Sequence, residues 1–426
     1  MLAAGGKQFQ DWSATYRLFE RDRIAQKELF APAIKSVLEN LDEEAPLFAM
    51  MDDTLIRKRG RKVAGTAWKR DPLGPAFHTN FVWGQRYLQV SVALPDLDVE
   101  GRARGIPIKF KHAPSPVKPN RHAPPEDWMT FRAQKKVSKI STVGATCLGD
   151  LREQIPKRKI VCAVDGSFTN QEVFRSMPKD TILIGRIRKD ASLFQVPEEM
   201  TGVMRGRKKY YGDRLPTPEE VRQDESIPWQ TVRAFAAGKW HEFKLKTMPT
   251  VRWKSSGDHD MRIVIIQPLA YRPRKGAKLL YRQPGYLICS DPYFPLDQLL
   301  QAYLWRWEIE LNFRDEKTIM GAGDAQVRTM SAVQSVPAFV VASYAYMLLA
   351  AHAVKVKTNS IPSPKWHSRN LSNRCSTQKI LSIFRSQYWG LEMEPNKSGF
   401  VSNSFESKSR FYSSDSLDSA VCYAFK

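Results

Sequence analysis

Short apolar runs that end in acids or turn residues recur along the chain, and they predict the strands of a sheet. The first run, LFAMMDDT at residues 47–54, indicates a buried strand with carboxylates at its C-terminal end. Four further runs, rich in β-branched and aromatic residues, also predict strands: NFVWGQRYLQVSVAL (80–94), KIVCAVDG (159–166), DTILIGRIRK (180–189) and GYLICSD (285–291). The run KIVCAVDG again closes on an acid, Asp165.

Longer stretches with helical spacing separate these strands. The first forty-odd residues predict helix, which Pro46 ends, and residues 128–155 predict another helical stretch. A helix after the last strand contains YLWRWEIELNFRDEK at residues 303–317, and a long apolar helix is predicted at 335–354. Helices and strands are therefore interleaved along most of the chain.

The remaining stretches show neither the strand period nor the helix period. Residues 104–126 hold six prolines and many basic groups and predict an extended loop, whereas residues 190–285 alternate short strand-like runs with turns. The predicted fold class is α/β (α+β), with a sheet flanked by helices. The predicted segments are a helical N-terminal region that could contact DNA (1–45), a first core part (46–170), a β-rich insertion (171–285), a second core part (286–355) and a loosely structured or locally helical C-terminal tail (356–426).

The helix at 303–317 carries a polar stripe on an otherwise aromatic and aliphatic surface. At 100° per residue, its four polar positions fall within about 60° of one another: Tyr303, Arg306, Glu310 and Lys317. Arg306 and Glu310 alone could form an ordinary surface ion pair, which is worth ~0.3 to 0.5 kcal/mol. Acids elsewhere in the chain decide between that interpretation and a functional one.

Three acidic positions share a similar local setting. Asp52 or Asp53 and Asp165 end apolar strands, and Glu310 lies on a helix that follows another strand. Carboxylates that converge from neighbouring strands and a helix repel one another unless a cation neutralises them, and hard oxygen ligands select Mg²⁺ or Mn²⁺. We therefore predict a site for two such ions, about 3.5 to 4 Å apart, that acts on a phosphodiester.

The composition agrees with a polyanionic partner. The 66 Lys and Arg against 44 Asp and Glu give a formal charge of +22, enough to attract nucleic acid or an anionic membrane. A merely basic surface remains an alternative. Basic runs at 57–62 (RKRGRK) and 205–209 (RGRKK) are predicted to contact DNA phosphates.

Cysteines and apolar stretches bear on the cellular setting. The five cysteines are scattered without a C-x-x-C pair, so they indicate neither a disulfide framework nor a zinc site, and the N-terminal sequence lacks a secretion signal. In the apolar stretch 335–354, Ser335 can cap a helix and Pro337 suits its first turn, which favours a buried core helix over a membrane span. A cytoplasmic protein without a membrane partner is predicted.

The spacing of the polar stripe resembles a known signature. Tyr303, two residues, Arg306, three residues, Glu310, six residues and Lys317 is similar to the Y-R-E-K pattern of bacterial insertion-sequence transposases of family four, a DDE group with an RNase H-like core. DDT at 52–54 resembles the D-x-T motif of the first acid, which favours Asp52 over Asp53. VDGSF at 164–168 resembles the motif of the second acid. The resemblance covers about residues 46–355.

This resemblance implies a chemistry and a set of site residues. It implies a cut-and-paste DNA transposase with Asp52, Asp165 and Glu310 as catalytic metal ligands, Mg²⁺ or Mn²⁺ as cofactor, and a homodimer that joins two element ends before strand transfer into target DNA. An aromatic residue of the insertion would hold a flipped base, and Trp229, Trp240 and Trp253 are candidates. The residues expected at DNA phosphates are Tyr303, Arg306 and Lys317, with Arg57, Lys58 and Arg59 from the first basic run.

Alternatives remain open from the sequence. A decayed or domesticated DNA-binding protein could keep the fold and the charge without catalysis, and a nuclease could use the same acids without joining DNA. Glu308, Asp315 and Glu316 lie off the stripe and are predicted to be solvated surface acids.

Overall fold

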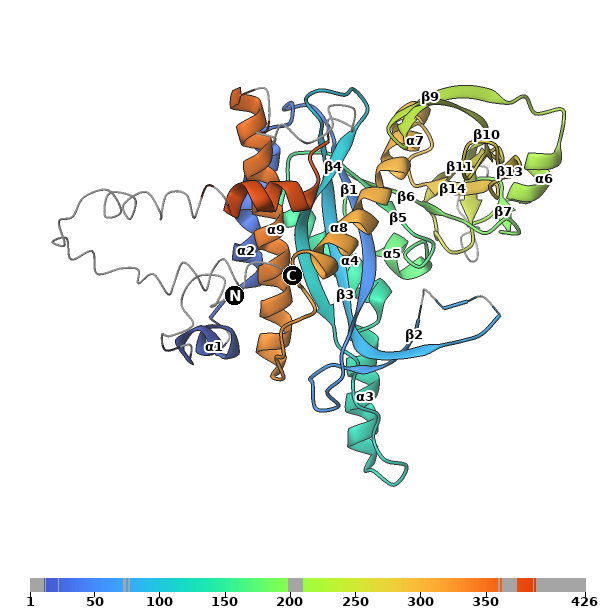
Figure 1. Cartoon of the computed structure of the whole chain (residues 1–426). Coiled ribbons are helices and arrows are strands. Elements are labelled where there is room, and N and C mark those ends of the chain that lie inside the picture. Colours follow the sequence, from blue (N-terminus) through green and yellow to red (C-terminus); the bar gives the residue numbers. More distant parts are fainter. Residues whose placement is uncertain are drawn as a thin grey trace.

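A mixed β-sheet with helices on both sides forms the centre of the protein (Figure 1). The computed structural model describes residues 11, 13–21, 23–71, 74–75, 77–197, 210–358, 361, 374–385 and 387. Its helices are α1 (Ser13–Glu20), α2 (Gln26–Glu39), α3 (Pro125–Val137), α4 (Ile140–Gln154), α5 (Gln171–Arg175), α6 (Pro218–Gln223), α7 (Leu296–Trp305), α8 (Trp307–Thr318) and α9 (Met330–Thr358).

The strands fall into one large sheet and a small hairpin of β12 and β13. Within the described residues, the large sheet has 12 strands in the order β2-β3-β1-β5-β6-β14-β11-β10-β7-β8, with β4 beside β3 and β9 beside β10. The strands are β1 (Leu47–Arg57), β2 (Ala67–Arg70), β3 (Phe81–Pro95), β4 (Ala103–Ala113), β5 (Ile160–Val164), β6 (Thr181–Arg186), β7 (Leu193–Phe194), β8 (Arg214–Leu215), β9 (Gln230–Ala236), β10 (Lys239–Trp253), β11 (Asp260–Ile266), β12 (Ala270–Tyr271), β13 (Leu280–Tyr281) and β14 (Gly285–Cys289).

Five strands make up the core of this sheet. β1 runs parallel to β5, and β5 runs parallel to β6. On the other side β3 lies antiparallel to both β1 and β4. The order β4-β3-β1-β5-β6, flanked by helices, confirms the predicted RNase H-like mixed sheet.

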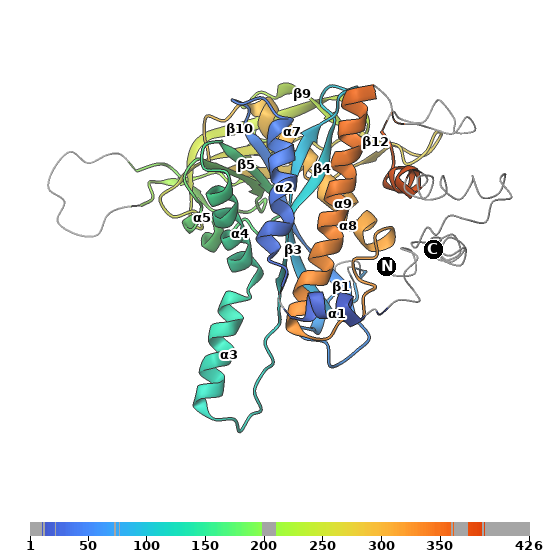
Figure 2. The same ribbon diagram turned by 90° about the vertical axis from the view of Figure 1, so that its left-hand side faces the viewer.

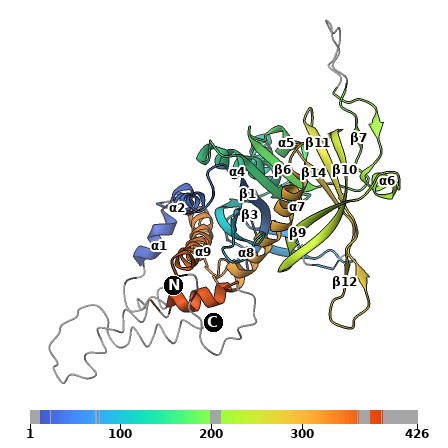
Figure 3. The same ribbon diagram turned by 90° about the horizontal axis from the view of Figure 1, so that it is seen from above.

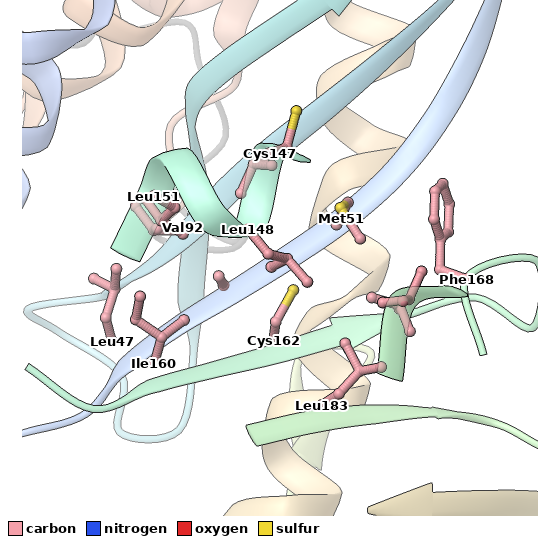
Figure 4. Close-up of a cluster of buried hydrophobic side chains, with 14 of the residues drawn as sticks. Leu47, Met51, Val92, Cys147, Leu148, Leu151, Ile160, Cys162, Phe168 and Leu183 are labelled. Atoms are coloured by element: carbon pink, nitrogen blue, oxygen red, sulfur yellow. The ribbon is translucent and has the colours of Figure 1, made fainter. Parts of the chain in front are cut away.

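Side chains of β1 alternate between the two faces of the sheet, and each face has its own cover. Leu47 and Met51 belong to a buried cluster with Leu148 and Leu151 of α4 (Figure 4). The neighbouring side chain of Met50 instead packs with residues of α8 in another buried cluster. Burial of each large aliphatic side chain contributes about 1.5 to 3 kcal/mol, so both clusters fix helices onto the sheet.

The segment between β6 and β14 extends the same sheet. β14 pairs with β6 on one side and with β11 on the other, and β11 continues to β10. These strands and the hairpin of β12 and β13 lie to one side of the core when the molecule is seen from above (Figure 3). The predicted β-rich insertion between Asp165 and Glu310 is confirmed. The basic run at 205–209 lies outside the described residues.

Two predictions about this sheet are wrong in detail. Asp52 does not end its strand, because antiparallel pairing with β3 continues from Ala49 to Arg57. The predicted loop at 104–126 is half strand, since β4 extends to Ala113. β4 tolerates Pro107 because it is an edge strand, and the register shifts at this point of the β3–β4 pair.

The long apolar helix α9 is a core helix. It begins at Met330, so Ser335 and Pro337 lie inside it and do not form its N-terminal cap. Among the described residues, it alone has the length and apolar composition to cross a membrane. Several of its buried side chains, among them Val341 and Leu348, belong to the clusters formed with the sheet. α2 lies alongside it, as two views show (Figures 1 and 2).

The predicted tail has an ordered part that packs on the core. Residues 377–385 are helical, and Ile380 is buried in the main cluster. Just before this helix, Arg374 forms an ion pair with Glu308 of α8. A segment far along the chain therefore contacts the helix that carries Glu310.

Candidate active site

Asp52 and Asp165 lie side by side on adjacent parallel strands. The pairing of β1 with β5 ends with Met51 opposite Val164, and each aspartate is the next residue of its own chain segment. The Asp52 side chain is 18% exposed. Burial raises the pKa of Asp52 to about 7, and the nearby charges of Asp53 and Asp165 act in the same direction. Two carboxylates thus meet where β5 ends.

Arg306 connects Asp52 to Glu310. One guanidinium nitrogen lies 3.1 Å from Oδ2 of Asp52, and the other lies 3.2 Å from Oε1 of Glu310. Burial raises the pKa of Glu310, which the Arg306 charge opposes and the charge of Asp165 reinforces. The pair of Arg306 and Glu310, for which the sequence left an ordinary surface ion pair as the alternative, is therefore part of a larger cluster. In this cluster one cation faces three acids.

The two adjacent aspartates of β1 have different surroundings. Asp52 contacts Arg306, whereas Asp53 accepts two hydrogen bonds from Arg86 of β3, at 2.6 and 2.7 Å. Alternation along the strand places them on opposite faces, and only Asp52 shares the face of Met50, which α8 covers. The geometry thus favours Asp52 over Asp53 as the partner of Asp165 and Glu310.

The polar stripe is divided between two helices. α7 ends at Trp305 and α8 begins at Trp307, so Arg306 lies at the junction, in contrast to the single helix that the sequence predicted. Its guanidinium carbon lies 5.8 Å from the ring centre of Tyr303. Nε of Arg306 is buried and has no acceptor among the described residues, so no hydrogen bond offsets its loss of hydration.

Lys317 reaches the same strand from the other end of α8. Its ammonium group donates to Oγ1 of Thr54 at 2.5 Å, and Thr54 lies two residues beyond Asp52. Burial lowers the pKa of Lys317. The structure therefore brings all four residues of the stripe to the face of the sheet on which Asp52 lies.

The first basic run is held in place by contacts with the protein itself. Arg57 forms an ion pair with Asp71 at 2.8 Å. The Lys58 ammonium donates to the carbonyls of Gly323 and Ala325, at 2.8 and 3.1 Å, and burial lowers its pKa. Arg59 is exposed. Of the three, Arg57 and Arg59 have the exposure that a phosphate contact requires.

The three candidate tryptophans differ in exposure. Trp253 packs edge-on against Phe174. The ring centre of Trp229 lies 4.6 Å from the ammonium nitrogen of Lys246. Trp240 is 39% exposed and has Arg233 over its ring. Trp240 is the most accessible of the three for a base.

Three acids predicted to be solvated are buried, so that prediction is wrong. Glu308 pairs with Arg374, Asp315 accepts a hydrogen bond from Thr377 at 2.6 Å, and Glu316 accepts one from Gln89 at 2.9 Å. Helical spacing placed them off the stripe, but the face opposite the stripe packs on other elements. Burial raises the pKa of Glu316 to about 8.

A buried polar network behind α8 was missed by the sequence analysis. Ser91 donates to Asn312 at 3.0 Å, and the Asn312 amide donates to the carbonyl of Gly105 at 3.0 Å. Gln89 donates to Ser91 and to Glu316. The polar residues Gln89 and Ser91 inside the apolar run of β3 were the signal, because a polar residue on a buried face needs a partner.

The donor set fits a hard divalent cation by its chemistry. Asp52, Asp165 and Glu310 offer carboxylate oxygens, and the charge of Arg306 offsets part of their mutual repulsion. No three acid, His or Cys side chains among the described residues are already placed as a metal cluster. The site therefore supplies suitable ligands without a preformed cage.

Comparison with known proteins gives a family for the chain. Residues 3–257 match the family model described as DDE superfamily endonuclease. The match includes Asp52 and Asp165 and ends before α8. No curated protein matches the chain.

Proposed function

Because the chain belongs to the DDE superfamily of endonucleases, we propose that it is a transposase that excises a DNA element and joins it to new DNA. The observation that carries this proposal is the convergence of Asp52, Asp165 and Glu310 around Arg306. These acids come from β1, from the end of β5 and from α8. Their proximity is therefore a result of the tertiary fold and not of the local structure of any one segment.

A finer assignment uses the polar stripe. We propose more specifically that the chain is a transposase of the family-four insertion-sequence type. Its stripe residues match the Y-R-E-K spacing and lie near Asp52: Tyr303, Arg306, Glu310 and Lys317. Arg306 contacts both Asp52 and Glu310, and Lys317 contacts Thr54 of the D-x-T motif. These contacts between the polar stripe and the D-x-T motif support a common role.

In this proposal each residue has a defined task. Asp52, Asp165 and Glu310 hold Mg²⁺ or Mn²⁺, with two ions expected. When bound, such ions activate water or a 3′-hydroxyl and stabilise the leaving oxygen of a phosphodiester. Arg306 neutralises the carboxylates, and its guanidinium group donates to a phosphate oxygen beside the reacting bond.

The surrounding residues hold the DNA. Tyr303 and Lys317 contact phosphates beside the reacting bond, and the exposed Arg57 and Arg59 contact the flanking duplex. Lys58 instead holds the segment through the carbonyls of Gly323 and Ala325. The net charge of +22 strengthens this binding at low salt. We further propose that the protein acts in the cytoplasm and that two copies bring two element ends together.

Cleavage of DNA separates this proposal from a DNA-binding protein without catalysis. A labelled duplex that carries the DNA flanking the gene is incubated with Mg²⁺, Mn²⁺ or chelator, and with the unmodified protein or Glu310→Gln. We expect metal-dependent nicks or hairpins at the element end, which the variant loses while it still binds DNA. Glu39→Gln is the matched control, because Glu39 is an exposed acid of α2.

Other outcomes contradict parts of the proposal. Binding without cleavage by the unmodified protein, under either metal, would indicate a decayed or domesticated DNA-binding protein. Cleavage of any duplex without joined products would indicate a nuclease. Equal loss of binding and cleavage in Glu310→Gln would contradict a metal-ligand role for Glu310.

A further inference from the structure

An arm formed by residues 114–137 projects from the body of the protein (Figures 1 and 2). A loop leads outward from β4, and α3 leads back to α4. None of the side chains of α3 is buried, and Met129 is 68% exposed. Little of the surface of α3 is therefore committed to packing within the fold.

The arm is basic. Its five cationic side chains face only two acids, and none of these seven groups forms an ion pair with a described residue: Lys118, Arg121, Arg132, Lys135 and Lys136 against Glu126 and Asp127. The two acids lie in the first turn of α3, where they favour the helix dipole. The cations of α3 therefore remain available to a partner.

Three of these cations share one face of α3. At 100° per residue, Arg132, Lys135 and Lys136 fall within about 100° of one another. The Lys135 ammonium lies 5.9 Å from the ring centre of Phe131, and that of Lys118 lies 5.9 Å from Trp128. Aromatic rings thus help to orient two of the arm's cations while leaving them exposed.

Both ends of the arm are anchored close to the proposed active site. At its start, the amide of Ser115 donates to the carbonyl of Gly65, which follows the basic run at 57–62. At its end, the Lys139 ammonium donates to Glu172 at 2.8 Å, and Glu172 lies in α5, shortly after Asp165.

The topology of the sheet places these anchors at one edge. β4 runs in the same direction as β1, because both are antiparallel to β3, and β5 is parallel to β1. The C-terminal ends of all three strands therefore lie at the same edge of the sheet. Asp165 and the first basic run lie at this edge too, so the arm leaves the body beside them.

We propose that the basic face of the arm binds the phosphate backbone of duplex DNA that continues past the active site. This inference rests on the proposed function, since it takes the DNA at Asp52, Asp165 and Glu310 as its reference. Charge complementarity selects this partner: a surface with unpaired cations and few acids fits a polyanion. A second copy of the chain, with the same positive arm, would be repelled at low salt.

The salt dependence of DNA binding tests the proposal. The full chain and the variant Arg132→Ala/Lys135→Ala/Lys136→Ala are titrated against a labelled duplex, in chelator, at several NaCl concentrations. Each lost phosphate contact lowers the slope of log K against log salt by roughly 0.9, so we expect a loss of about 2 to 3 units. Alanine favours helix, so α3 is retained.

Two matched variants sharpen the result. Lys157→Ala/Lys159→Ala/Lys179→Ala removes three exposed cations that precede β5 and β6, at the opposite end of these strands from Asp165. Its slope is expected to stay within about 0.5 units of the unmodified value. Arg132→Lys/Lys135→Arg/Lys136→Arg keeps the charges and is expected to keep the slope. Circular dichroism of all variants checks the helix content.

Each remaining outcome overturns one statement. An unchanged slope in the alanine variant, or an equal change in the control, overturns the arm proposal, even if the protein cleaves DNA. Loss of a dimer in sedimentation without DNA, at unchanged slope, assigns the arm to self-association instead. An arm-dependent slope in a protein that never cleaves DNA leaves the arm proposal standing and contradicts the proposed function.

Discussion

Asp52 and Asp165 are held by the sheet, whereas Glu310 is held by contacts between distant segments. The first two follow a paired position of β1 and β5, so backbone hydrogen bonds set their spacing. Glu310 lies on α8, which is fixed by the ion pair of Glu308 with Arg374 and by the bond of Asn312 with Gly105. Substitutions near α8 are therefore expected to perturb Glu310 without moving the aspartates.

The largest expected effect comes from the sheet side of the site. Asp52→Asn is expected to lower cleavage roughly 10²- to 10³-fold, because metal ions contribute several kcal/mol to transition-state stabilisation. Asp53→Asn is the matched control, since Asp53 binds Arg86 and faces away from α8. Single-turnover cleavage of labelled duplex measures both. A larger loss in Asp53→Asn would reverse their assignment.

Removing the contact between the C-terminal segment and α8 tests how Glu310 is held in place. Arg374→Ala leaves the largely buried Glu308 without its partner, so we expect a loss of about 2 to 4 kcal/mol in the free energy of unfolding. Cleavage is expected to fall as well, because α8 loses an anchor. Urea denaturation measures stability, with Lys35→Ala, which breaks an exposed pair, as control. Equal midpoints for the two variants would show that the segment does not hold α8.

Two glycines permit close packing, one beside α8 and one beside the strands that hold the aspartates. A Cβ at Gly105 of β4 would lie 2.9 Å from Oδ1 of Asn312, and one at Gly185 of β6 would lie 2.2 Å from Oγ1 of Thr169. We expect Gly105→Ala and Gly185→Ala each to lower stability by about 1 to 3 kcal/mol.

A third glycine serves as the control for both. Gly149 of α4 has open space around it, and its replacement by Ala is expected to stabilise the helix by about 0.5 to 1 kcal/mol. Thermal unfolding compares the three variants. We expect Gly105→Ala to displace α8 through Asn312. We expect Gly185→Ala to displace the turn after Asp165 through Thr169. Similar stabilities in all three would contradict the close approaches.

The smallest effect concerns pH and the network behind α8. The pKa of Glu316 is raised to about 8 by burial, so the folded state keeps a proton that the unfolded state loses at lower pH. Stability is then expected to fall as pH rises from the ordinary carboxyl range towards 8. Glu316→Gln removes this dependence and keeps an acceptor for Gln89.

Chemical denaturation at pH 6 and pH 8 measures the effect. We expect the unmodified protein to lose about 1 to 2 kcal/mol more than Glu316→Gln, below the limit of about 1.4 kcal/mol for each of the two pH units. Lys317 and Asp315, the charged neighbours of Glu316, are unchanged in both proteins. Parallel pH curves would show that Glu316 is charged in the folded state.

The sequence predicted the elements of the site better than their packing. The apolar runs located β1 and β5, and the spacing of the stripe selected Arg306 and Glu310, because strand and helix periods are local properties. The helical period wrongly predicted that Glu308, Asp315 and Glu316 are solvated. These acids are buried because a second face of α8 packs on β3, β4 and residues 374–380.

The sequence by itself determined which acids could form a site. The resemblance of DDT to the D-x-T motif favoured Asp52 over Asp53, and the positions of Asp165 and Glu310 after or beside predicted strands gave them comparable settings. Only the tertiary structure decided that β1 and β5 are parallel neighbours, that Arg306 joins Asp52 to Glu310, and that Arg374 packs on α8. Periodicity reports the environment of each residue but carries no information on which distant segment supplies it, and that choice depends on burial and charge pairing across the whole fold.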